Sequence, residues 1–197
     1  MRATEGADRG LGSGDAETSV ALVGAPNAGK SALFGRLTAE YADVSNYPGT
    51  TVETTAAALG SLRLSDTPGV HGISSFSEAE RVTRAAVLEA DAVVNVVDAT
   101  QLGRDLFVTL QLTDMGVPTV VALNMMDEAE ADGVAIDVDA LESALGVPVV
   151  PTVAVTGAGV DKLRDRLPEA SAPESTPIDS YYDALPDGVD ATRAEKT

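Results

Sequence analysis

The segment Gly24 to Ser31, GAPNAGKS, combines residue types that can bind a chain of phosphates. It matches the pattern G-x-x-x-x-G-K-[ST], in which glycines let consecutive backbone N–H groups face phosphate oxygens. A strand expected at 19–23 precedes it and a helix expected at 30–37 follows, so the positive end of that helix also faces the phosphates. Lys30 is expected to neutralise the β- and γ-phosphates and Ser31 to ligate Mg²⁺, whereas a glycine-rich turn without a ligand is the alternative. The predicted phosphate-binding residues are Gly24, Ala25, Pro26, Asn27, Ala28, Gly29, Lys30 and Ser31.

The segment Asn124 to Asp127, NMMD, carries the residues that can identify the base, which the phosphate loop alone cannot do. An Asp carboxylate can accept hydrogen bonds from N1–H and the N2 amino group of guanine, whereas adenine offers no matching pair of donors. Asn124 can contact N7 and brace the loop, with Met125 beside it. The motif follows a strand expected at 119–123, at the edge of the sheet where ligands bind in such folds. The alternative for Asp127 is a helix N-cap, but the motif's place in the chain favours guanine.

Between these motifs lies the segment DTPG, which is Asp66, Thr67, Pro68 and Gly69. Asp66 is expected to hold Mg²⁺ through water and the Gly69 N–H to meet the γ-phosphate, so this loop should change shape when that phosphate leaves. An ordinary type I or II turn is the alternative for a Pro-Gly pair.

Two threonines, Thr50 and Thr51, follow segment 42–49, which is expected to be a loop and ends in Gly49. One of them must ligate Mg²⁺ in the GTP state, and Thr51 is the predicted ligand; the predicted catalytic set is Lys30, Thr51 and Gly69. Ras-like enzymes place a Gln directly after Asp-x-x-Gly to orient the attacking water. Here Val70 and His71 follow, and a hydrocarbon side chain cannot orient water, which predicts slow hydrolysis. For His71, the only histidine, we favour an exposed loop position over a general base.

The elements that must position these residues alternate between apolar and amphipathic segments, which is typical of a mostly parallel sheet covered by helices on both faces. Together with the motifs, this alternation predicts an α/β P-loop GTPase fold of the Ras-like type. A hairpin is expected across Gly60, and Gly146 is expected to cap the helix before it. The expected strands are 19–23, 52–59, 62–65, 92–97, 119–123 and 147–155, and the expected helices are 30–37, 78–89, 102–115, 138–145 and 160–167.

The length and the apolar pattern fit one domain of 197 residues. We expect this domain at 19–168, after a flexible extension at 1–18 and before an acidic tail or truncated linker, rich in Pro, Ser and Asp, at 169–197. No apolar run approaches the roughly 20 residues that cross a bilayer, and the start lacks the apolar core of a signal peptide. The sequence therefore predicts a cytoplasmic chain with no membrane span. Cysteine is absent, which excludes disulfides and thiolate metal sites.

Charge is strongly one-sided, with 31 acidic against 13 basic residues and a formal net charge of −18. Such a surface repels nucleic-acid phosphate, which argues against a nucleic-acid partner. Only Lys30, Lys162 and Lys196 are lysines. An acidic, lysine-poor surface is what high intracellular salt would tolerate, so a halophilic origin is one hypothesis and an acidic mesophilic protein is the other.

Several segments resemble the G domain of the ferrous iron transport protein B family, FeoB, over about residues 20–167. They are the phosphate loop with Pro26 and Asn27, residues 46–53 (NYPGTTVE), residues 96–106 (VVDATQLGRDL), residues 109–112 (TLQL) and residues 120–127 (VVALNMMD). The resemblance implies that Thr51 closes on Mg²⁺ and that Asn27 helps to coordinate an activating K⁺. It also implies that Ala154, Val155 and Thr156 border the base through backbone contacts, although Ala154 stands where serine is usual.

In that family the domain precedes a small helical domain and a large membrane domain for Fe²⁺ passage. The resemblance therefore implies a switch that regulates Fe²⁺ uptake, with a membrane iron-permease domain or subunit as its partner at the inner face of the cell membrane. Whether the chain is a fragment or a free-standing relative stays open. The alternatives are a ribosome- or tRNA-associated GTPase, which the negative charge disfavours, and a nucleotide-gated docking module with little turnover. Iron itself has no expected site, because carboxylates and one His are the only candidate ligands.

Overall fold

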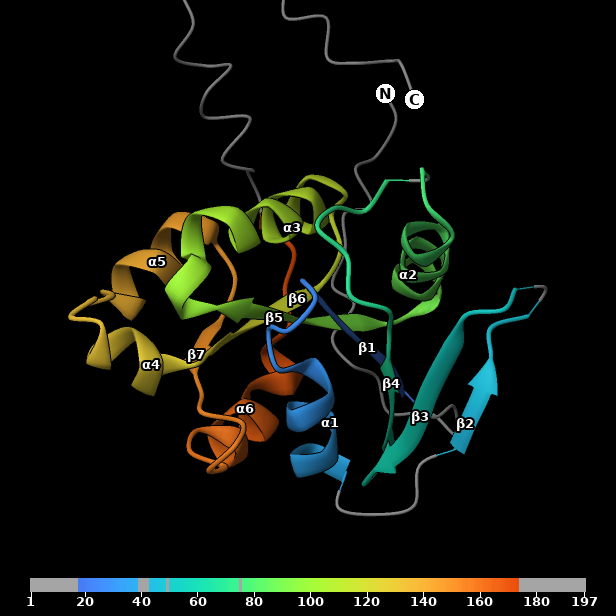
Figure 1. The fold of residues 1–197 in the computed structure, drawn as a ribbon, viewed down its shortest axis with the longest axis horizontal. Helices are drawn as coiled ribbons and strands as arrows, with labels where there is room; N and C mark the ends of the chain where they lie inside the picture. The colour runs from blue at the N-terminus through green and yellow to red at the C-terminus, as the bar shows by residue number, and fades with distance from the viewer. Residues whose placement is uncertain (1–17, 39–42, 49, 75, 174–197) are drawn as a thin grey trace, which may run out of the picture.

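A seven-stranded sheet forms the centre of the molecule (Figure 1). The computed structural model describes residues 18–38, 43–48, 50–74 and 76–173. The strands are β1 (Thr18–Gly24), β2 (Asp43–Asn46), β3 (Glu53–Leu59), β4 (Leu62–Asp66), β5 (Ala92–Asp98), β6 (Thr119–Asn124) and β7 (Val149–Pro151). Their order is β2-β3-β4-β1-β5-β6-β7. The strands from β4 to β7 are parallel, whereas β2, β3 and β4 pair antiparallel. The predicted mostly parallel sheet and the hairpin across Gly60 are confirmed.

Helices cover both faces of this sheet, as predicted. The α-helices are α1 (Lys30–Thr38), α2 (Glu78–Glu89), α3 (Leu102–Asp114), α4 (Met126–Ala131), α5 (Val138–Leu145) and α6 (Val160–Arg166), with two 3₁₀ turns, η1 (Ala99–Gln101) and η2 (Leu167–Glu169). Figure 1 shows α1 and α6 on one side of the sheet and α2, α3 and α5 on the other.

The core follows from the alternation of side chains along the strands. In β1, Val20 and Leu22 pack in a cluster with Leu33 of α1 and Leu163 of α6. The intervening residues of β1 face the opposite cluster, which includes residues of α2 and α3. β5 and β6 are buried along almost their whole length, which is why their sequences are apolar without alternation.

Three local predictions differ from the structure. β2 forms in the segment that was expected to be a loop, although its residues Asp43–Asn46 are all exposed. Backbone pairing with β3, which no apolar pattern announces, makes it a strand. The strand expected at 147–155 ends at Pro151, because the chain turns at 153–158, where the Val153 N–H donates to the Ala158 C=O (2.9 Å). α4 was not predicted, because its six residues are too few to show a helical period.

Four of the chemistry-bearing loops follow the carboxyl ends of parallel strands, so they meet at one edge of the sheet, whereas Thr50 and Thr51 lie between the antiparallel strands β2 and β3. The phosphate loop follows β1, the Asp66 loop ends β4, Asn124 ends β6, and the turn 153–158 follows β7. At the opposite edge Ser171 bridges Thr119, so hydrogen bonds extend past the expected domain end at Pro168.

A candidate nucleotide-binding site at the carboxyl edge of the sheet

The phosphate loop, residues 24–31, connects the end of β1 with the first turn of α1. Gly29 has φ +91°, and a Cβ there would lie 2.2 Å from Nδ2 of Asn124, so no other residue fits without movement. Asn27 adopts the left-handed conformation at φ 66° and is exposed. The loop therefore forms a tight turn that runs directly into the N-terminus of α1, as the motif predicts.

Lys30 is buried within this loop, with only 7% of its surface exposed. Its Nζ donates to the Ala25 C=O over 3.4 Å. Burial lowers the pKa of Lys30, while the negative charges of Asp66 and Asp105 oppose that shift. A poorly solvated cation beside the loop N–H groups is suited to bind an anion, because a phosphate chain would replace the solvation that the ammonium lacks.

Ser31 and Asp66 meet beside Lys30. The Ser31 hydroxyl donates to Oδ2 of Asp66 over 2.8 Å, and Oδ1 of Asp66 is buried without a hydrogen-bond partner among the described residues. Burial raises the pKa of Asp66, and the Ser31 hydrogen bond and Lys30 oppose the rise. An orphaned carboxylate oxygen next to a hydroxyl is an all-oxygen donor set of the kind that Mg²⁺ prefers, so the residues present fit this ion.

The Asp66–Gly69 loop is fixed to β1 and the phosphate loop. The N–H and hydroxyl of Thr67 both donate to the Leu22 C=O, over 3.2 and 2.7 Å, and the Val70 N–H donates to the Gly24 C=O over 3.0 Å. A Cβ on Gly69 would lie 2.8 Å from Cα of Pro26, so glycine permits this close approach. Val70 is buried and His71 is exposed, which agrees with the preferred interpretation of His71.

Asn124 joins three segments of the site. Its Nδ2 donates to the Ala28 C=O in the phosphate loop (2.9 Å), and its Oδ1 accepts from the Ala154 N–H (2.9 Å) and the Thr152 hydroxyl (3.2 Å). Only 2% of Asn124 is exposed. Asp127 lies in the first turn of α4 with its side chain exposed, and the N-cap position belongs to Met125, which has φ 61°. Asp127 is therefore not the N-cap.

The turn 153–158 contains Ala154, Val155 and Thr156 and is joined to Asn124 by a hydrogen bond, while their predicted contact with the base stays a prediction. The Ala154 N–H, however, already donates to Oδ1 of Asn124, so it is not free to make the predicted backbone contact. Sequence reasoning missed Arg36 of α1, whose Nε donates to the Ala154 C=O over 3.2 Å and whose Nη2 donates to the Val155 C=O. No motif announces this contact, because it joins residues 118 and 119 positions apart.

Thr50 and Thr51 lie between β2 and β3, within residues 47–52, and their hydrogen bonds go to groups other than Ser31 and Asp66. The Thr50 hydroxyl donates to the Tyr47 C=O (2.9 Å), and the Thr51 N–H donates to Glu78, the first residue of α2 (3.3 Å). Figure 1 shows this end of the β2–β3 hairpin at the outer margin of the sheet. Gly49 lies outside the described residues. Thr51 would have to move to reach Mg²⁺, so its predicted role stays a prediction.

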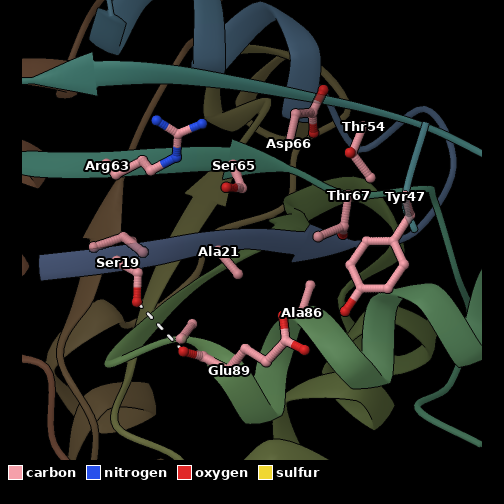
Figure 2. A pocket seen from close by; sticks show the side chains of 12 residues that line it. Ser19, Ala21, Tyr47, Thr54, Arg63, Ser65, Asp66, Thr67, Ala86 and Glu89 are labelled. Atoms are coloured by element: carbon pink, nitrogen blue, oxygen red, sulfur yellow. Dashed lines mark hydrogen bonds between the residues drawn. The ribbon is translucent and has the colours of Figure 1, made fainter. Parts of the chain in front are cut away.

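A cavity of about 250 Å³ lies beside the Mg²⁺ donor set, between β1, β4 and α2. Figure 2 shows Asp66 and Thr67 at one end of it and Tyr47 reaching across to α2. Burial raises the pKa of Tyr47, and a hydrogen bond to the Glu89 carboxylate raises it further. Tyr47 therefore ties the turn 47–52 to α2 at the margin of the site.

Together, the fold, the phosphate loop and the Asp66 loop define a P-loop GTPase-type α/β domain. A family model described as "Ferrous iron transport protein B" matches residues 18–167, and the chain belongs to this family. Among curated relatives, the Fe(2+) transport protein A/Fe(2+) transporter FeoB fusion protein of Porphyromonas gingivalis is 43% identical over 155 residues, which are 75% of this chain and 18% of that protein. The Fe(2+) transporter FeoB of Salmonella typhimurium is 38% identical over 177 residues, which are 85% of this chain and 23% of that protein. The chain thus spans about a fifth of the length of these relatives.

Solved structures agree with this assignment. A mutant S. thermophilus NFeoB bound to mGDP superposes with a TM-score of 0.76 at 40% identity, over 79% of this chain and 62% of that one. The cytosolic domain of L. pneumophila FeoB gives 0.74 at 40% identity, over 79% and 64% of the two chains. The S. thermophilus NFeoB bound to GDP.AlF4- and K⁺ gives 0.70 at 40% identity, over 79% and 62%.

No helix within the described ranges combines the length and the apolar character that spanning a membrane requires. In the same part of the chain, no group of three or more His, Asp or Glu side chains could hold a metal ion.

Proposed function

We propose that this chain binds GTP and GDP with Mg²⁺ and hydrolyses GTP. The observation that carries the proposal is the Ser31–Asp66 pair beside buried Lys30, with its orphaned carboxylate oxygen. The comparisons add support, because related structures are described as bound to mGDP and to GDP.AlF4-. Asp127, exposed in the first turn of α4, is the proposed acceptor for guanine.

Each residue of the proposed site has a distinct role. Lys30 and the N–H groups of residues 25–31 orient the phosphates, and Ser31 and Asp66 hold Mg²⁺, which neutralises charge that develops on the transferred phosphoryl group. The Gly69 N–H contacts the γ-phosphate from the loop that packs against Pro26. Thr51 would leave Glu78 and serve as a Mg²⁺ ligand when GTP binds, which would couple the turn 47–52 to the nucleotide state.

Slow intrinsic turnover is part of the proposal. The residue after Gly69 is Val70, whose side chain is buried and whose N–H donates to the Gly24 C=O. Val70 therefore has no group left to orient water. The adjacent His71 is exposed on the loop. Hydrolysis then depends on Lys30, Mg²⁺ and backbone groups.

Potassium stimulation through Asn27 is a further proposal. Asn27 is exposed in the phosphate loop, and one related structure is described as bound to K⁺. Asn27→Ala is expected to remove the faster GTP hydrolysis in KCl over NaCl while GDP affinity stays within about threefold, because the Lys30 and Ser31 contacts remain. Multiple-turnover phosphate release in the two salts, with GDP titration as the control, measures both. Equal K⁺ stimulation in the variant would refute the role.

The place of this domain is proposed from its relatives. Several are described as Fe(2+) transporters and one structure as a cytosolic domain. We infer a cytosolic GTP-dependent switch that regulates Fe²⁺ uptake through a membrane iron-permease domain or subunit. A docking module with little turnover is the second candidate, since Thr51 is bonded to Glu78 rather than to Ser31 or Asp66.

Phosphate release from GTP and from ATP, each with Mg²⁺ in matched KCl and NaCl, tests the proposal. Lys30→Ala serves as the control for contaminating hydrolases. Release from GTP alone, absent in Lys30→Ala, is the expected result. Tight GTP binding without release would favour the docking module, and equal use of ATP would refute guanine selectivity.

A further inference from the structure

Arg36 connects the phosphate-binding helix to the turn 153–158. Its Nε donates to the Ala154 C=O over 3.2 Å and its Nη2 donates to the Val155 C=O. A Cβ on Gly157 would lie 3.8 Å from Nη1 of Arg36, so the guanidinium also lies over this glycine. One side chain from α1 thus donates hydrogen bonds to two residues of the turn and lies near a third.

These two hydrogen bonds fix two consecutive peptide groups. In a planar trans peptide the C=O and the following N–H point in opposite directions. Holding the Ala154 C=O therefore orients the Val155 N–H away from the guanidinium, and holding the Val155 C=O orients the Thr156 N–H in the same way. The rigid fork of arginine suits this geometry, because it can donate to two acceptors without loss of its own planarity.

The Val155 N–H is the donor that the turn leaves open. The Ala154 N–H donates to Asn124, the N–H groups of Thr156 and Gly157 donate to the Val153 C=O, and the Ala158 N–H donates to the Thr156 hydroxyl. Among the described residues, the Val155 N–H has no acceptor, and 69% of Val155 is exposed. A base beside Asn124 could use this donor without breaking a hydrogen bond of the turn.

We propose that Arg36 is a positioning residue that aims the Val155 N–H at the guanine carbonyl oxygen, and so sets both the lifetime of the bound nucleotide and the preference for guanine. This inference rests on the proposed guanine nucleotide site. Arg36 touches no nucleotide itself; it acts through the Ala154 and Val155 peptides. The hydroxyl of Thr156 and the side chain of Asn124 hold the other side of the turn.

Displacement of a fluorescent GDP analogue with Mg²⁺ measures the effect on release. Arg36→Ala is expected to raise the dissociation rate about tenfold, since two hydrogen bonds that orient the donor are lost. The association rate should change less than twofold, because the phosphate loop is intact. The dissociation rate of Arg36→Lys should lie between those of Arg36→Ala and the unchanged protein, because an ammonium cannot donate to both carbonyls in the same fork geometry. The ratio of GDP to ADP affinity should fall in Arg36→Ala.

Arg164→Ala is the matched control. Arg164 also donates to a backbone carbonyl, that of Leu37 at the end of α1 (3.2 Å), but it does not touch the turn. Its GDP dissociation rate should match that of the unchanged protein. Equal acceleration in both variants, or a rate in Arg36→Ala within twofold of the unchanged protein, would overturn the inference.

Amide hydrogen exchange of residues 153–158 in the nucleotide-free protein provides a test that does not depend on nucleotide binding. Arg36→Ala should exchange faster at Thr156 and Gly157, whose N–H groups close the turn, while Arg164→Ala should not. Unchanged exchange in Arg36→Ala would overturn the inference. Failure of the unchanged protein to bind GDP would instead refute the proposed function, and the exchange result would still decide whether Arg36 holds the turn.

Discussion

Asn124 illustrates what a single side chain contributes to this site. The side-chain amide of Asn124 donates to the Ala28 C=O and accepts from the Ala154 N–H and the Thr152 hydroxyl. It therefore connects the phosphate loop with the turn after β7. Buried amides with both ends paired hold their neighbours in one arrangement, and losing them leaves partners without hydrogen bonds. Asn124 is therefore expected to support the shape of the site before nucleotide binds as well as to contact a base.

Asn124→Ala should lower the free energy of unfolding of the nucleotide-free protein by about 2 kcal/mol, because the Ala28 C=O and the Ala154 N–H lose a buried partner. Urea denaturation without nucleotide measures this change. Gln101→Ala, an exposed amide without a side-chain cap hydrogen bond, is the control and should stay within about 0.5 kcal/mol. A loss no larger than in the control would show that Asn124 is not structural.

Replacing Asp66 is expected to change the free energy of unfolding in the opposite direction to replacing Asn124. Burial raises the pKa of its carboxyl group, so its folded-state pKa lies above the unfolded value. The stability it contributes is complete below the unfolded pKa and is lost as the pH rises through the folded pKa. Asp66→Asn should then leave the nucleotide-free protein as stable at pH 7 or more stable by up to about 1 kcal/mol, given partial exposure.

The same variant should lose at least about tenfold in Mg²⁺-dependent GDP affinity, since the negative charge that would hold the ion through water is gone. Urea denaturation from pH 4 to 7 and GDP titration with and without Mg²⁺ measure the two effects. A variant that is clearly less stable at pH 7, or that keeps its Mg²⁺ dependence, would contradict this account of Asp66.

Motif residues could be located from the sequence because their spacing is fixed by phosphate and base chemistry. Gly29, Ser31, Asp66 and Asn124 come together as expected. Arg36 could not be found, because its two contacts depend on how α1 lies against the turn, and no local pattern records that. The engaged Ala154 N–H was missed for the same reason: it depends on a side chain 30 positions away.

For the helices and strands, the bounds were predicted accurately where capping residues mark the ends of an element. α2 and α5 have the predicted bounds, and both have strong ends: Ser77 and Glu80 form a capping box at α2, and Gly146 closes α5 at φ 68°. β2 lacked such signals, since it is short, polar and exposed and is held only by backbone pairing. Elements with end signals in their own sequence could thus be predicted, whereas an element held only by pairing with a neighbouring strand could not.

The contact between α5 and α6 provides an element-scale prediction. Glu142 accepts from Nη1 and Nη2 of Arg166, over 2.7 and 3.0 Å, and from the Val149 N–H at the start of β7 (2.7 Å). The Arg166 hydrogen bonds hold the pKa of Glu142 below its usual value. Its contribution to stability is therefore present above the unfolded pKa and is lost as the pH falls through the folded pKa.

Glu142→Gln should lower the free energy of unfolding by about 1 kcal/mol at pH 7, a modest value because both side chains are partly exposed. The difference should close as the pH is lowered through the acidic range. Denaturant titrations at both ends of that range measure it. Asp161→Asn, which removes the exposed partner of Arg164, is the control and should cost less than about 0.5 kcal/mol. A constant difference at all pH values would rule out the ion pair as its cause.

For the whole molecule, net charge is the dominant property. A formal charge of −18 on 197 residues means that folding concentrates like charges. Raising KCl from about 0.1 to 1 M shortens the Debye length from about 10 to 3 Å and should raise the denaturation midpoint. The same rise in NaCl would assign the effect to screening rather than to specific K⁺ binding. A midpoint that falls or stays constant would count against the halophilic hypothesis.

The first and last described segments lie at the same edge of the sheet, the edge opposite the candidate site. Thr18 starts β1, Ser171 pairs with the first residue of β6, and both strands run away from that edge toward the loops that carry the site. A fluorescent label or affinity tag joined near either residue would therefore lie at the rear of the domain, leaving the nucleotide entrance clear. Surface immobilisation through these points would present every molecule with its site facing solution.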